Sequence, residues 1–509
     1  MLELKNLNIS LKKDGRQIIS DFSFSLSGHD KAVIIGEEGN GKSTLLKYIY
    51  DPLLTYDYCE CSGEVIKKGK LAYLSQTIED KYLNCSLAKY FEQSEYYYHI
   101  DILSSLSLPV DFIQSDRKIS TLSGGERVKI QLAKILMDVP DVLLLDEPTN
   151  DLDIYSLRWL ESFIAESPLP VLYISHDETL IKKTANVIVH MEQIYKKTQC
   201  RTTVSRCSYS DYISFRADSF AHNDQVAQKQ RDNYEKQLEK WQSIYNRVSY
   251  EQNSISRRNP SGGRLLKKKM HSTLAMKKRI EREKEEFLDF SVEEDAILAK
   301  FDGSIALPAG KQILNLNIEK LTIEKQVLAE KIKLAVTGCE HIGITGRNGA
   351  GKSTLLALIW QELKCRKDIT PAYMPQNYYE VLDYNKTPIE YLSDIYSAED
   401  VTRARTFMGS MKFTHDEMTG KIKDLSGGQQ AKILFLDMVL RKADVLILDE
   451  PTRNFSPLSC PVIRRSLRDF KGAIISISHD RRFLSEVCDK VYELRSNGLF
   501  IVDKSEILS

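Results

Sequence analysis

Short apolar runs that end at a glycine or at a carboxylate recur along the chain. Residues 32–35 form one such run, which stops at Gly36 and is followed from Thr44 by apolar residues at helical spacing. This order predicts a buried strand, a glycine loop and a helix. Two further runs, 142–145 and 445–448, each end at an aspartate. Because continuous apolar runs of this length are typical of buried parallel strands, the pattern predicts an α/β fold with functional side chains at the strand ends.

The chain repeats one series of motifs in the same order. The motifs of the first copy are GEEGNGKST at 36–44, LSGG at 122–125, DEPT at 146–149 and SHD at 175–177; those of the second are GRNGAGKST at 346–354, LSGG at 425–428, DEPT at 449–452 and SHD at 478–480. From the LSGG serine, the DEPT aspartate is 23 residues away and the SHD histidine 53 residues away in both copies. We therefore predict one nucleotide-binding domain at 1–205, a second at 296–509 and a connecting segment at 206–295.

The two glycine loops are predicted to bind phosphate. Glycines let backbone N–H groups converge at the positive end of the following helix, a lysine neutralises β/γ oxygens, and a serine ligates Mg²⁺. The predicted contacts are Gly36, Gly39, Gly41, Lys42, Ser43 and Thr44 in the first loop, and Gly346, Gly349, Gly351, Lys352, Ser353 and Thr354 in the second.

Carboxylates at the strand ends complete a phosphoryl-transfer pattern. Asp146 and Asp449 are expected to face the metal, and Glu147 and Glu450 to act as general bases on the attacking water. The predicted γ-phosphate sensors are His176 and His479, which end the apolar runs 171–175 and 474–478. The predicted metal set is Ser43, Gln76, Asp146, Ser353, Gln376 and Asp449. The implied cofactors are a nucleotide and Mg²⁺, and the implied chemistry is attack of water on the γ-phosphate.

The connecting segment predicts a helical hairpin. Apolar residues recur at steps of 4, 3, 4 and 3, at Tyr234, Leu238, Trp241, Tyr245 and Val248, and a weaker matching stripe is Leu266, Met270, Ile280 and Phe287. Such seams seek an antiparallel partner. Between them, 253–264 contains NPSGG, which we expect to break both helices and to form an exposed tip.

Charge is concentrated in this segment, although the whole chain has 71 basic and 71 acidic residues. Residues 247–279 contain one acidic residue, Glu251, and ten basic ones: Arg247, Arg257, Arg258, Arg264, Lys267, Lys268, Lys269, Lys277, Lys278 and Arg279. A solvated helix face is the simplest explanation of a lysine run. Charge of one sign on a projecting tip instead favours recognition of polyphosphate, and we expect RNA.

The motifs of both halves resemble those of ATP-binding cassette ATPases, with LSGG as the diagnostic element. The resemblance implies two domains that close head-to-tail over two ATP molecules. Site one would then join Lys42, Ser43, Gln76, Asp146, Glu147 and His176 to Ser426, Gly427, Gly428 and Gln429; site two would join the corresponding second-copy residues to Ser123, Gly124, Gly125 and Glu126. Two departures stand out. The segments 11–16 and 323–327 lack the aromatic residue that commonly stacks on adenine. The segment after DEPT, the D-loop, reads NDLD at 150–153 in the first copy, as the family expects, but RNFSP at 453–457 in the second.

Twin cassettes joined by a charged helical linker resemble the ABC-F family of ribosome-binding translation factors. The resemblance implies a linker that enters the ribosomal E site, meets P-site tRNA and approaches the peptidyl transferase centre. Ser123 comes only 47 positions after Gln76, and 30 residues follow His479, which leaves no obvious arm insertion or C-terminal extension. With the RNFSP D-loop, this is similar to Gram-positive members that protect ribosomes from lincosamides, pleuromutilins and streptogramin A.

Composition sets the remaining expectations. Hydrophobic residues make up 42% and charged residues 28% of 509, no run of 18 apolar residues occurs, and the first ten residues carry charges. These features predict a soluble cytoplasmic protein of several domains. Nine cysteines without paired zinc spacing are expected to be thiols, mostly buried. We expect a monomer with intramolecular cassette pairing. A housekeeping ABC-F factor, a transporter ATPase subunit and a DNA-binding cassette protein remain alternatives.

Overall fold

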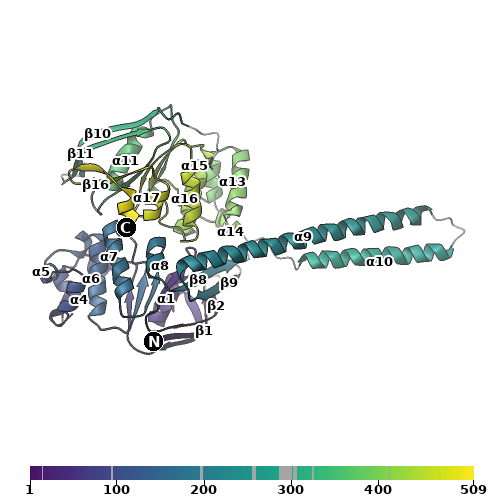
Figure 1. Ribbon diagram of the computed structural model, residues 1–509, viewed down its shortest axis with the longest axis horizontal. Helices are drawn as coiled ribbons and strands as arrows, with labels where there is room; N and C mark the ends of the chain where they lie inside the picture. Colours follow the sequence, from purple (N-terminus) through teal and green to yellow (C-terminus); the bar gives the residue numbers. More distant parts are fainter. Residues whose placement is uncertain are drawn as a thin grey trace. The chain divides into compact units, whose positions relative to one another are not determined.

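The computed structural model describes most of the chain. The described residues are 1–13, 15–92, 94, 96–194, 199–254, 260–285, 301, 307–323, 326–411 and 413–508. They form two compact units, one made of Met1–Tyr209 and Glu294–Ser509 and the other of Ser210–Glu293. The first unit contains both predicted cassettes, and the second contains the helices of the linker (Figure 1).

The first cassette is built on a six-stranded sheet. The strand order of this sheet is β5-β6-β7-β3-β8-β9, and all neighbouring strands are parallel except β8 and β9. The same cassette also has a three-stranded sheet with the order β2-β1-β4. The strands are β1 (Leu2–Leu11), β2 (Gln17–Leu26), β3 (Lys31–Ile35), β4 (Cys59–Lys67), β5 (Leu71–Leu74), β6 (Val142–Asp146), β7 (Val171–Ile174), β8 (Val187–Ile194) and β9 (Gln199–Ser205). Every residue of β3, β6 and β7 is buried, as the continuous apolar runs predict.

Helices of the first cassette follow the strand ends. The helices are α1 (Lys42–Tyr50), α2 (Asp80–Leu83), α3 (Leu87–Phe91), α4 (Ile100–Ser105), α5 (Val110–Ile113), α6 (Gly124–Leu136), α7 (Ile154–Glu166) and α8 (Glu178–Thr184), with 3₁₀ turns η1 (Pro52–Leu54), η2 (Tyr96–Tyr98) and η3 (Ile119–Thr121). Apolar side chains of α1 pack with β1, β2, β3 and β6 into one core that includes Leu45, Leu46 and Ile34. This packing holds the start of α1 against the carboxyl end of β3.

The second cassette repeats the parallel sheet in the order β13-β14-β15-β12-β16-β17 and pairs β10 with β11. Its strands are β10 (Gln312–Ile323), β11 (Gln326–Thr337), β12 (His341–Thr345), β13 (Pro371–Met374), β14 (Val445–Asp449), β15 (Ala473–Ile477), β16 (Lys490–Arg495) and β17 (Gly498–Val502). Its helices are α11 (Lys352–Leu363), α12 (Pro388–Ser393), α13 (Ala398–Ser410), α14 (His415–Thr419), α15 (Gly427–Leu440), α16 (Cys460–Arg468), α17 (Arg481–Glu486) and α18 (Lys504–Leu508), with 3₁₀ turns η5 (Tyr378–Glu380) and η6 (Ile422–Asp424).

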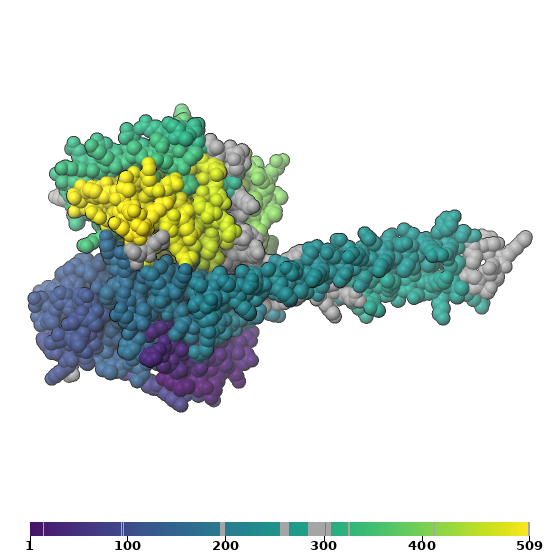
Figure 2. All heavy atoms as spheres, in the orientation of Figure 1, coloured from purple at the N-terminus to yellow at the C-terminus, as the bar shows by residue number. Residues whose placement is uncertain are grey.

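The linker contains two long helices, α9 (Tyr209–Ser254) and α10 (Pro260–Glu285), which run side by side (Figure 1). The Trp241 indole N–H donates to the Thr273 carbonyl at 2.8 Å, and the Lys277 ammonium lies 5.2 Å from the Trp241 ring centroid. In Figure 2 the atoms of the two helices, in teal, lie against each other. The hairpin is thus held by one apolar seam with a buried hydrogen bond at its middle.

The predicted seam and turn are partly corrected. Trp241, Val248, Leu266 and Ile280 are buried, whereas Tyr234, Leu238, Tyr245 and Met270 are only half-buried; Phe287 lies outside the described residues. The two helices are separate elements, as expected, but the range 253–264 is too wide, because α9 continues through Ser254 and α10 begins at Pro260. Proline is tolerated in the first turn of a helix, where its missing N–H has no intrahelical acceptor.

Two further sequence expectations meet the structure. All nine cysteines are free thiols, but only Cys59, Cys460 and Cys488 are buried, so the expectation of mostly buried thiols is wrong. Over the ranges given above, none of the helices combines the length and the apolar character that a membrane crossing needs.

We expect Trp241→Ala to loosen the hairpin, because it removes both the largest buried ring of the seam and the hydrogen bond to the Thr273 carbonyl. The cost should be about 3 kcal/mol or more, whereas Trp241→Phe should cost about 1 kcal/mol through the lost hydrogen bond. Hydrogen exchange of the α9 and α10 amides measures the difference. Equal protection in the two variants would contradict this account.

Candidate functional site

The first glycine loop has the backbone that a phosphate site requires. Gly36, Gly39 and Gly41 have φ values of 149°, 79° and 84°, in the region that glycine adopts far more readily than other residues. A Cβ added at Gly41 would lie 2.0 Å from the Ile18 side chain. The Lys42 ammonium donates to the carbonyls of Gly36 at 2.8 Å and Glu37 at 3.0 Å, so it lies across the loop with the first turn of α1 behind it.

The second loop has the same geometry. Gly346, Gly349 and Gly351 have φ values of 145°, 79° and 92°, and the Lys352 ammonium donates to the Gly346 and Arg347 carbonyls, each at 2.9 Å. Burial lowers the pKa of Lys42 and of Lys352, while the nearby carboxylates oppose that shift. Both loops therefore present a cation and the N–H groups of a helix start to the same small volume.

Oxygen ligands for a metal stand together in each copy. The Ser43 hydroxyl donates to one oxygen of Asp146 at 2.8 Å, and the Tyr73 hydroxyl donates to the other at 2.9 Å. Burial raises the pKa of Asp146, and these two hydrogen bonds oppose the rise. Asp449 is similarly buried and hydrogen-bonded to Ser353. Serine and aspartate oxygens suit Mg²⁺, which usually completes its shell with water and phosphate oxygens.

Glu147 is held as an ionised carboxylate. It accepts hydrogen bonds from the side-chain amides of Gln76 at 3.0 Å and Asn150 at 2.7 Å, and His176 Nε2 lies 3.4 Å from its other oxygen. Burial would raise the pKa of Glu147, but the hydrogen bond and charge of His176 and the charge of Lys42 outweigh it and lower the pKa to about 2. Its φ of 48° is unusual for glutamate and indicates stored backbone strain.

The corresponding Glu450 has fewer partners. One oxygen accepts the His479 backbone N–H at 3.3 Å, and His479 Nε2 is 3.9 Å from the other. Burial and the neighbouring Asp449 raise the pKa of Glu450 to about 8, and burial lowers the pKa of His479 to about 3. The two copies therefore share a backbone, with φ of 53° at Glu450, but differ in their electrostatics.

The two LSGG segments begin helices α6 and α15. Ser123 and Glu126 form a capping box, and so do Ser426 and Gln429. A Cβ at Gly124 would lie 2.0 Å from the Asp151 carbonyl oxygen, and one at Gly428 would lie 2.6 Å from that of Asn454. Glycine is thus required where each helix start meets the D-loop of its own cassette.

Site two is a composite of both cassettes. A cavity of about 720 Å³ is lined by Ser123, Gly124 and Glu126 from the first cassette and by Gly349, Gly351, Lys352, Ser353, Thr354, Gln376, Asp449, Glu450 and His479 from the second. Of the predicted set, Gly125 and Gly346 are absent from this lining. His176 of the other predicted site also lines it, and its Nδ1 lies 2.9 Å from the Phe455 carbonyl oxygen.

Site one is closed by direct protein contacts. The Gly428 N–H donates to the Glu38 carboxylate at 2.6 Å, which brings the first glycine loop against the start of α15. The associated cavity is about 30 Å³ and is lined by Glu37, Glu38, Ser426, Gly428 and Gln429 among others. At the position of Glu38 the second loop has Asn348, whose side chain donates to the Asp151 carbonyl. Glu38 therefore adds a negative charge where site two has a neutral amide.

Several contacts escaped the sequence analysis. Tyr73 holds Asp146, Asn150 holds Glu147, and Glu38 meets the opposite helix. A tyrosine stands three positions before the predicted glutamine in both copies, as Tyr73 before Gln76 and Tyr373 before Gln376, and this repeat could have indicated the role of Tyr73. The Glu38 contact had no such signal, since it joins residues 390 positions apart. Among the described residues no group of three or more His, Cys, Asp or Glu side chains could hold a metal.

The sequence is similar to those of known ATP-binding proteins. The sequence model of the family described as "ABC transporter" matches residues 19–150 and 329–453. Putative ATP-binding protein YdiF of Bacillus subtilis is 27% identical over 98% of this chain and 80% of its own length. ABC transporter F family member 2 of Arabidopsis thaliana is 26% identical over 97% and 76%. Probable ATP-binding protein YheS of Escherichia coli K12 is 30% identical over 74% and 56%.

A solved structure shares the fold. The structure titled as the complex of archaeal ribosomal stalk protein aP1 and archaeal ribosome recycling factor aABCE1 matches with a TM-score of 0.59 at 17% identity, over 97% of this chain and 89% of that one. Fold and sites together define a twin-cassette ATPase that uses ATP and Mg²⁺. The chain belongs to the ATP-binding cassette family.

We expect Glu38→Gln to tighten ATP binding at site one, because it removes a carboxylate that would oppose the phosphates. One such charge at a partly solvated site is worth about 1 kcal/mol, or several-fold in Kd. Fluorescent-nucleotide titration in a Lys352→Ala background isolates site one. Asn348→Asp, measured in a Lys42→Ala background, is the reciprocal control and should weaken binding at site two. Unchanged affinity in both variants would contradict this role of the charge.

Proposed function

We propose that this chain is a cytoplasmic, ATP-driven ribosome-binding factor that inserts its hairpin at the E site. The hairpin would reach toward P-site tRNA and the peptidyl transferase centre of the large-subunit rRNA. The observation that carries the proposal is a basic hairpin attached to a twin-cassette ATPase. The chain would act as a monomer whose two cassettes pair within one molecule.

The distribution of side chains on α10 supports RNA as the target. Leu266, Thr273 and Ile280 recur every seven residues and are buried. The basic residues stand on the remaining faces: Arg264, Lys267, Lys268, Lys269, Lys278 and Arg279 are exposed and Lys277 is half-buried, and on α9 the Arg247 side chain is 83% exposed. Arg257 and Arg258 lie outside the described residues. A row of exposed cations beside a seam that already stabilises the hairpin is available for phosphate.

The relatives support the same target. Similar folds occur in structures titled with an archaeal ribosome recycling factor and with ribosome-bound archaeal Pelota and ABCE1, the latter at a TM-score of 0.56. The sequence relatives of ABC-F type cover nearly the whole chain, including the hairpin. A function on the ribosome therefore accounts for both the cassettes and the linker.

Nucleotide binding and hydrolysis at the two sites would control when the hairpin can bind the ribosome. Lys42 and Lys352 bind phosphate oxygens, Ser123 and Ser426 meet the nucleotide held by the opposite cassette, and closure of both sites makes the hairpin competent to bind. Glu147 and Glu450 orient the attacking water, and His176 and His479 respond to the γ-phosphate. The Ser43–Asp146 and Ser353–Asp449 pairs, with Gln76 and Gln376, would hold Mg²⁺, which would neutralise charge on the phosphates.

Within this function we favour protection of the ribosome from antibiotics. Insertion of the hairpin would shift tRNA and remodel the pocket of a lincosamide, pleuromutilin or streptogramin A. The RNFSP D-loop at 453–457 and the short interval between Gln76 and Ser123 support this subgroup. Expression in a susceptible host should raise the inhibitory concentration of at least one of these drugs. Unchanged sensitivity with intact ribosome binding would instead indicate a housekeeping translation factor.

We expect Glu147→Gln with Glu450→Gln to trap the chain on ribosomes in the presence of ATP, because binding and closure persist while the water is no longer activated. Loss of a general base costs about 100-fold or more in turnover. Cosedimentation with ribosomes, with and without ATP, measures the trapping. Release of the double variant from ribosomes in the presence of ATP would contradict the proposal. A complex with membranes or duplex DNA but not with ribosomes would point to a transporter subunit or a DNA-binding protein.

Neutralising the basic row should weaken ribosome binding in a salt-dependent way. We expect Lys267→Ala, Lys268→Ala and Lys269→Ala together to lower the slope of log affinity against log salt by about 2 to 3, since each phosphate contact contributes about 0.7 to 0.9. The matched control replaces Lys229, Lys236 and Lys240, three exposed lysines of α9 outside the basic segment, by alanine. Equal losses in the two triple variants would show that only overall charge matters.

A further inference from the structure

Four charged side chains are buried where the two cassettes meet. Glu161 of α7 and Glu178 of α8 belong to the first cassette, and Arg464 of α16 and Arg481 of α17 belong to the second. Their exposed fractions are 5%, 5%, 2% and 1%. Burying charge is costly unless the charge is paired, so their arrangement requires an explanation.

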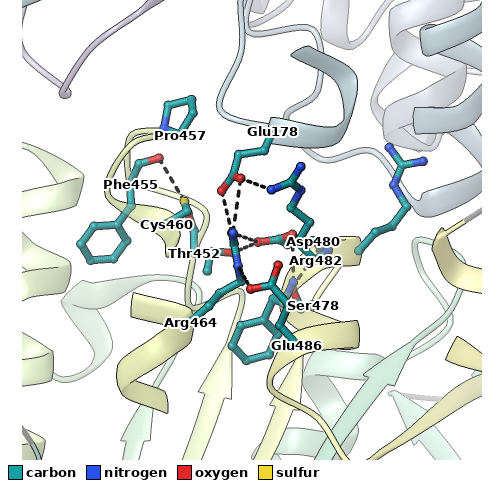
Figure 3. A network of polar contacts seen from close by, with 12 residues as sticks. Glu178, Thr452, Phe455, Pro457, Cys460, Arg464, Ser478, Asp480, Arg482 and Glu486 are labelled. Atoms are coloured by element: carbon teal, nitrogen blue, oxygen red, sulfur yellow. Dashed lines mark hydrogen bonds and ion pairs between the residues drawn. The ribbon is translucent and has the colours of Figure 1, made fainter. Parts of the chain in front are cut away.

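Each arginine is paired with a glutamate of the other cassette. The Arg464 guanidinium donates to the two oxygens of Glu178 at 2.6 and 3.3 Å (Figure 3). The Arg481 guanidinium donates to one oxygen of Glu161 at 3.2 Å and also contacts the other. Both pairs are bidentate, which is the strongest geometry for a guanidinium and a carboxylate.

The two pairs are related by the internal repeat. The DEPT and SHD motifs recur 303 positions apart, and the same shift carries Glu161 to Arg464 and Glu178 to Arg481. The contacts 178–464 and 161–481 are therefore equivalent under the pseudo-twofold relation of the cassettes. At both equivalent positions the first cassette has an acid and the second has a base.

This reversal of sign has a consequence for pairing. If two first cassettes met through the same surface, Glu161 would face Glu178 of the other copy twice; two second cassettes would bring Arg464 against Arg481. Buried like charges at these distances are strongly unfavourable, whereas the pairing of unlike cassettes satisfies every charge. An arginine at the start of α17 gains nothing from the helix dipole, so local helix stability does not account for it.

We propose that Glu161, Glu178, Arg464 and Arg481 form a recognition surface whose partner is the unlike cassette and which rejects the like cassette of a second copy. Twin cassettes with similar backbones would otherwise be able to pair with those of other molecules. The charge pattern directs closure to the pairing in which the phosphate-binding loop of one cassette meets the LSGG helix of the other.

Other charges surround the four without deciding the pairing. Arg482 contacts Glu178 at 2.8 Å, Glu486 contacts Arg464 at 2.8 Å, and Lys183 contacts Glu161 at 3.1 Å. These three side chains are 27%, 41% and 42% exposed, so water can solvate them in any pairing. Asp177 and Asp480 lie 3.9 Å from Arg481 and Arg464 and each caps the helix that follows it.

Two double variants with the same types of substitution separate the sign pattern from general disruption. Glu178→Arg with Arg481→Glu makes both contacts between unlike cassettes repulsive and makes both contacts between like cassettes attractive. Glu161→Arg with Arg481→Glu, the matched control, also makes both contacts between like cassettes attractive but keeps every contact between unlike cassettes attractive. Both variants leave the net charge unchanged, and both carry the same change at Arg481.

We expect the first variant to lose about tenfold or more of its ATPase activity, since breaking a buried ion pair is strongly unfavourable. In the Glu147→Gln, Glu450→Gln background it should form dimers with ATP, seen by light scattering after size-exclusion chromatography. The control should keep its activity within about threefold, since the charges between unlike cassettes stay paired. Equal ATPase activity of the two variants, whether high, low or absent, overturns the proposal.

A neutral variant provides a second test in case charge reversal prevents folding. Replacing all four residues by glutamine removes both attraction and repulsion while keeping polar side chains. We expect this chain to fold, to hydrolyse ATP and to show a mixture of monomer and dimer with ATP at concentrations where the natural sequence is monomeric. A neutral variant that is strictly monomeric at the same concentrations would overturn the proposal.

Discussion

The structure depends on the contact between the two cassettes, in which the glycine loop of each copy lies opposite the helix that begins at the LSGG segment of the other. Neither half can build that contact alone, because the loop and the helix start of one cassette lie on separate parts of its own surface. Site two shows the result: residues of both copies line one cavity, with Lys352 on one side and Ser123 on the other. The two cassettes therefore act together, and the interactions that control how they pair also control whether this composite site can form.

The two sites have a common backbone and different charges. Glu147 is surrounded by donors, whereas Glu450 is buried beside another carboxylate, and the pKa values of the two move in opposite directions. Glu38 adds a carboxylate to site one at the position where site two has Asn348. Duplication of a fold preserves the strand and loop geometry, because packing constrains it, while polar side chains in the sites are free to diverge.

In the hairpin, different side chains stabilise the packing of the two helices and face the proposed partner. Trp241, Thr273 and Ile280 are buried between its helices, whereas the exposed Lys267, Lys268 and Lys269 of α10 lie outside the seam that holds the helices together. Cations that a fold does not need are available to a partner, and their number makes an RNA partner the natural proposal. Between the cassettes the reverse holds, because the buried charges of Arg464 and Arg481 are paired with glutamates within the fold.

The sequence by itself determined the parts of this protein that depend on neighbouring residues. Strands β3, β6 and β14, the turns at Gly41 and Gly351, and the caps at Ser123 and Ser426 follow from local patterns, and the repeat revealed two equivalent domains. A local pattern also misled, since NPSGG was read as a turn although α10 begins at Pro260. Only the tertiary structure decided that Glu38 meets Gly428, that His176 meets the Phe455 carbonyl, and that Glu161 and Arg481 are buried together. Burial and charge pairing between residues hundreds of positions apart arise when the two cassettes pack, and no local stretch of sequence contains that packing.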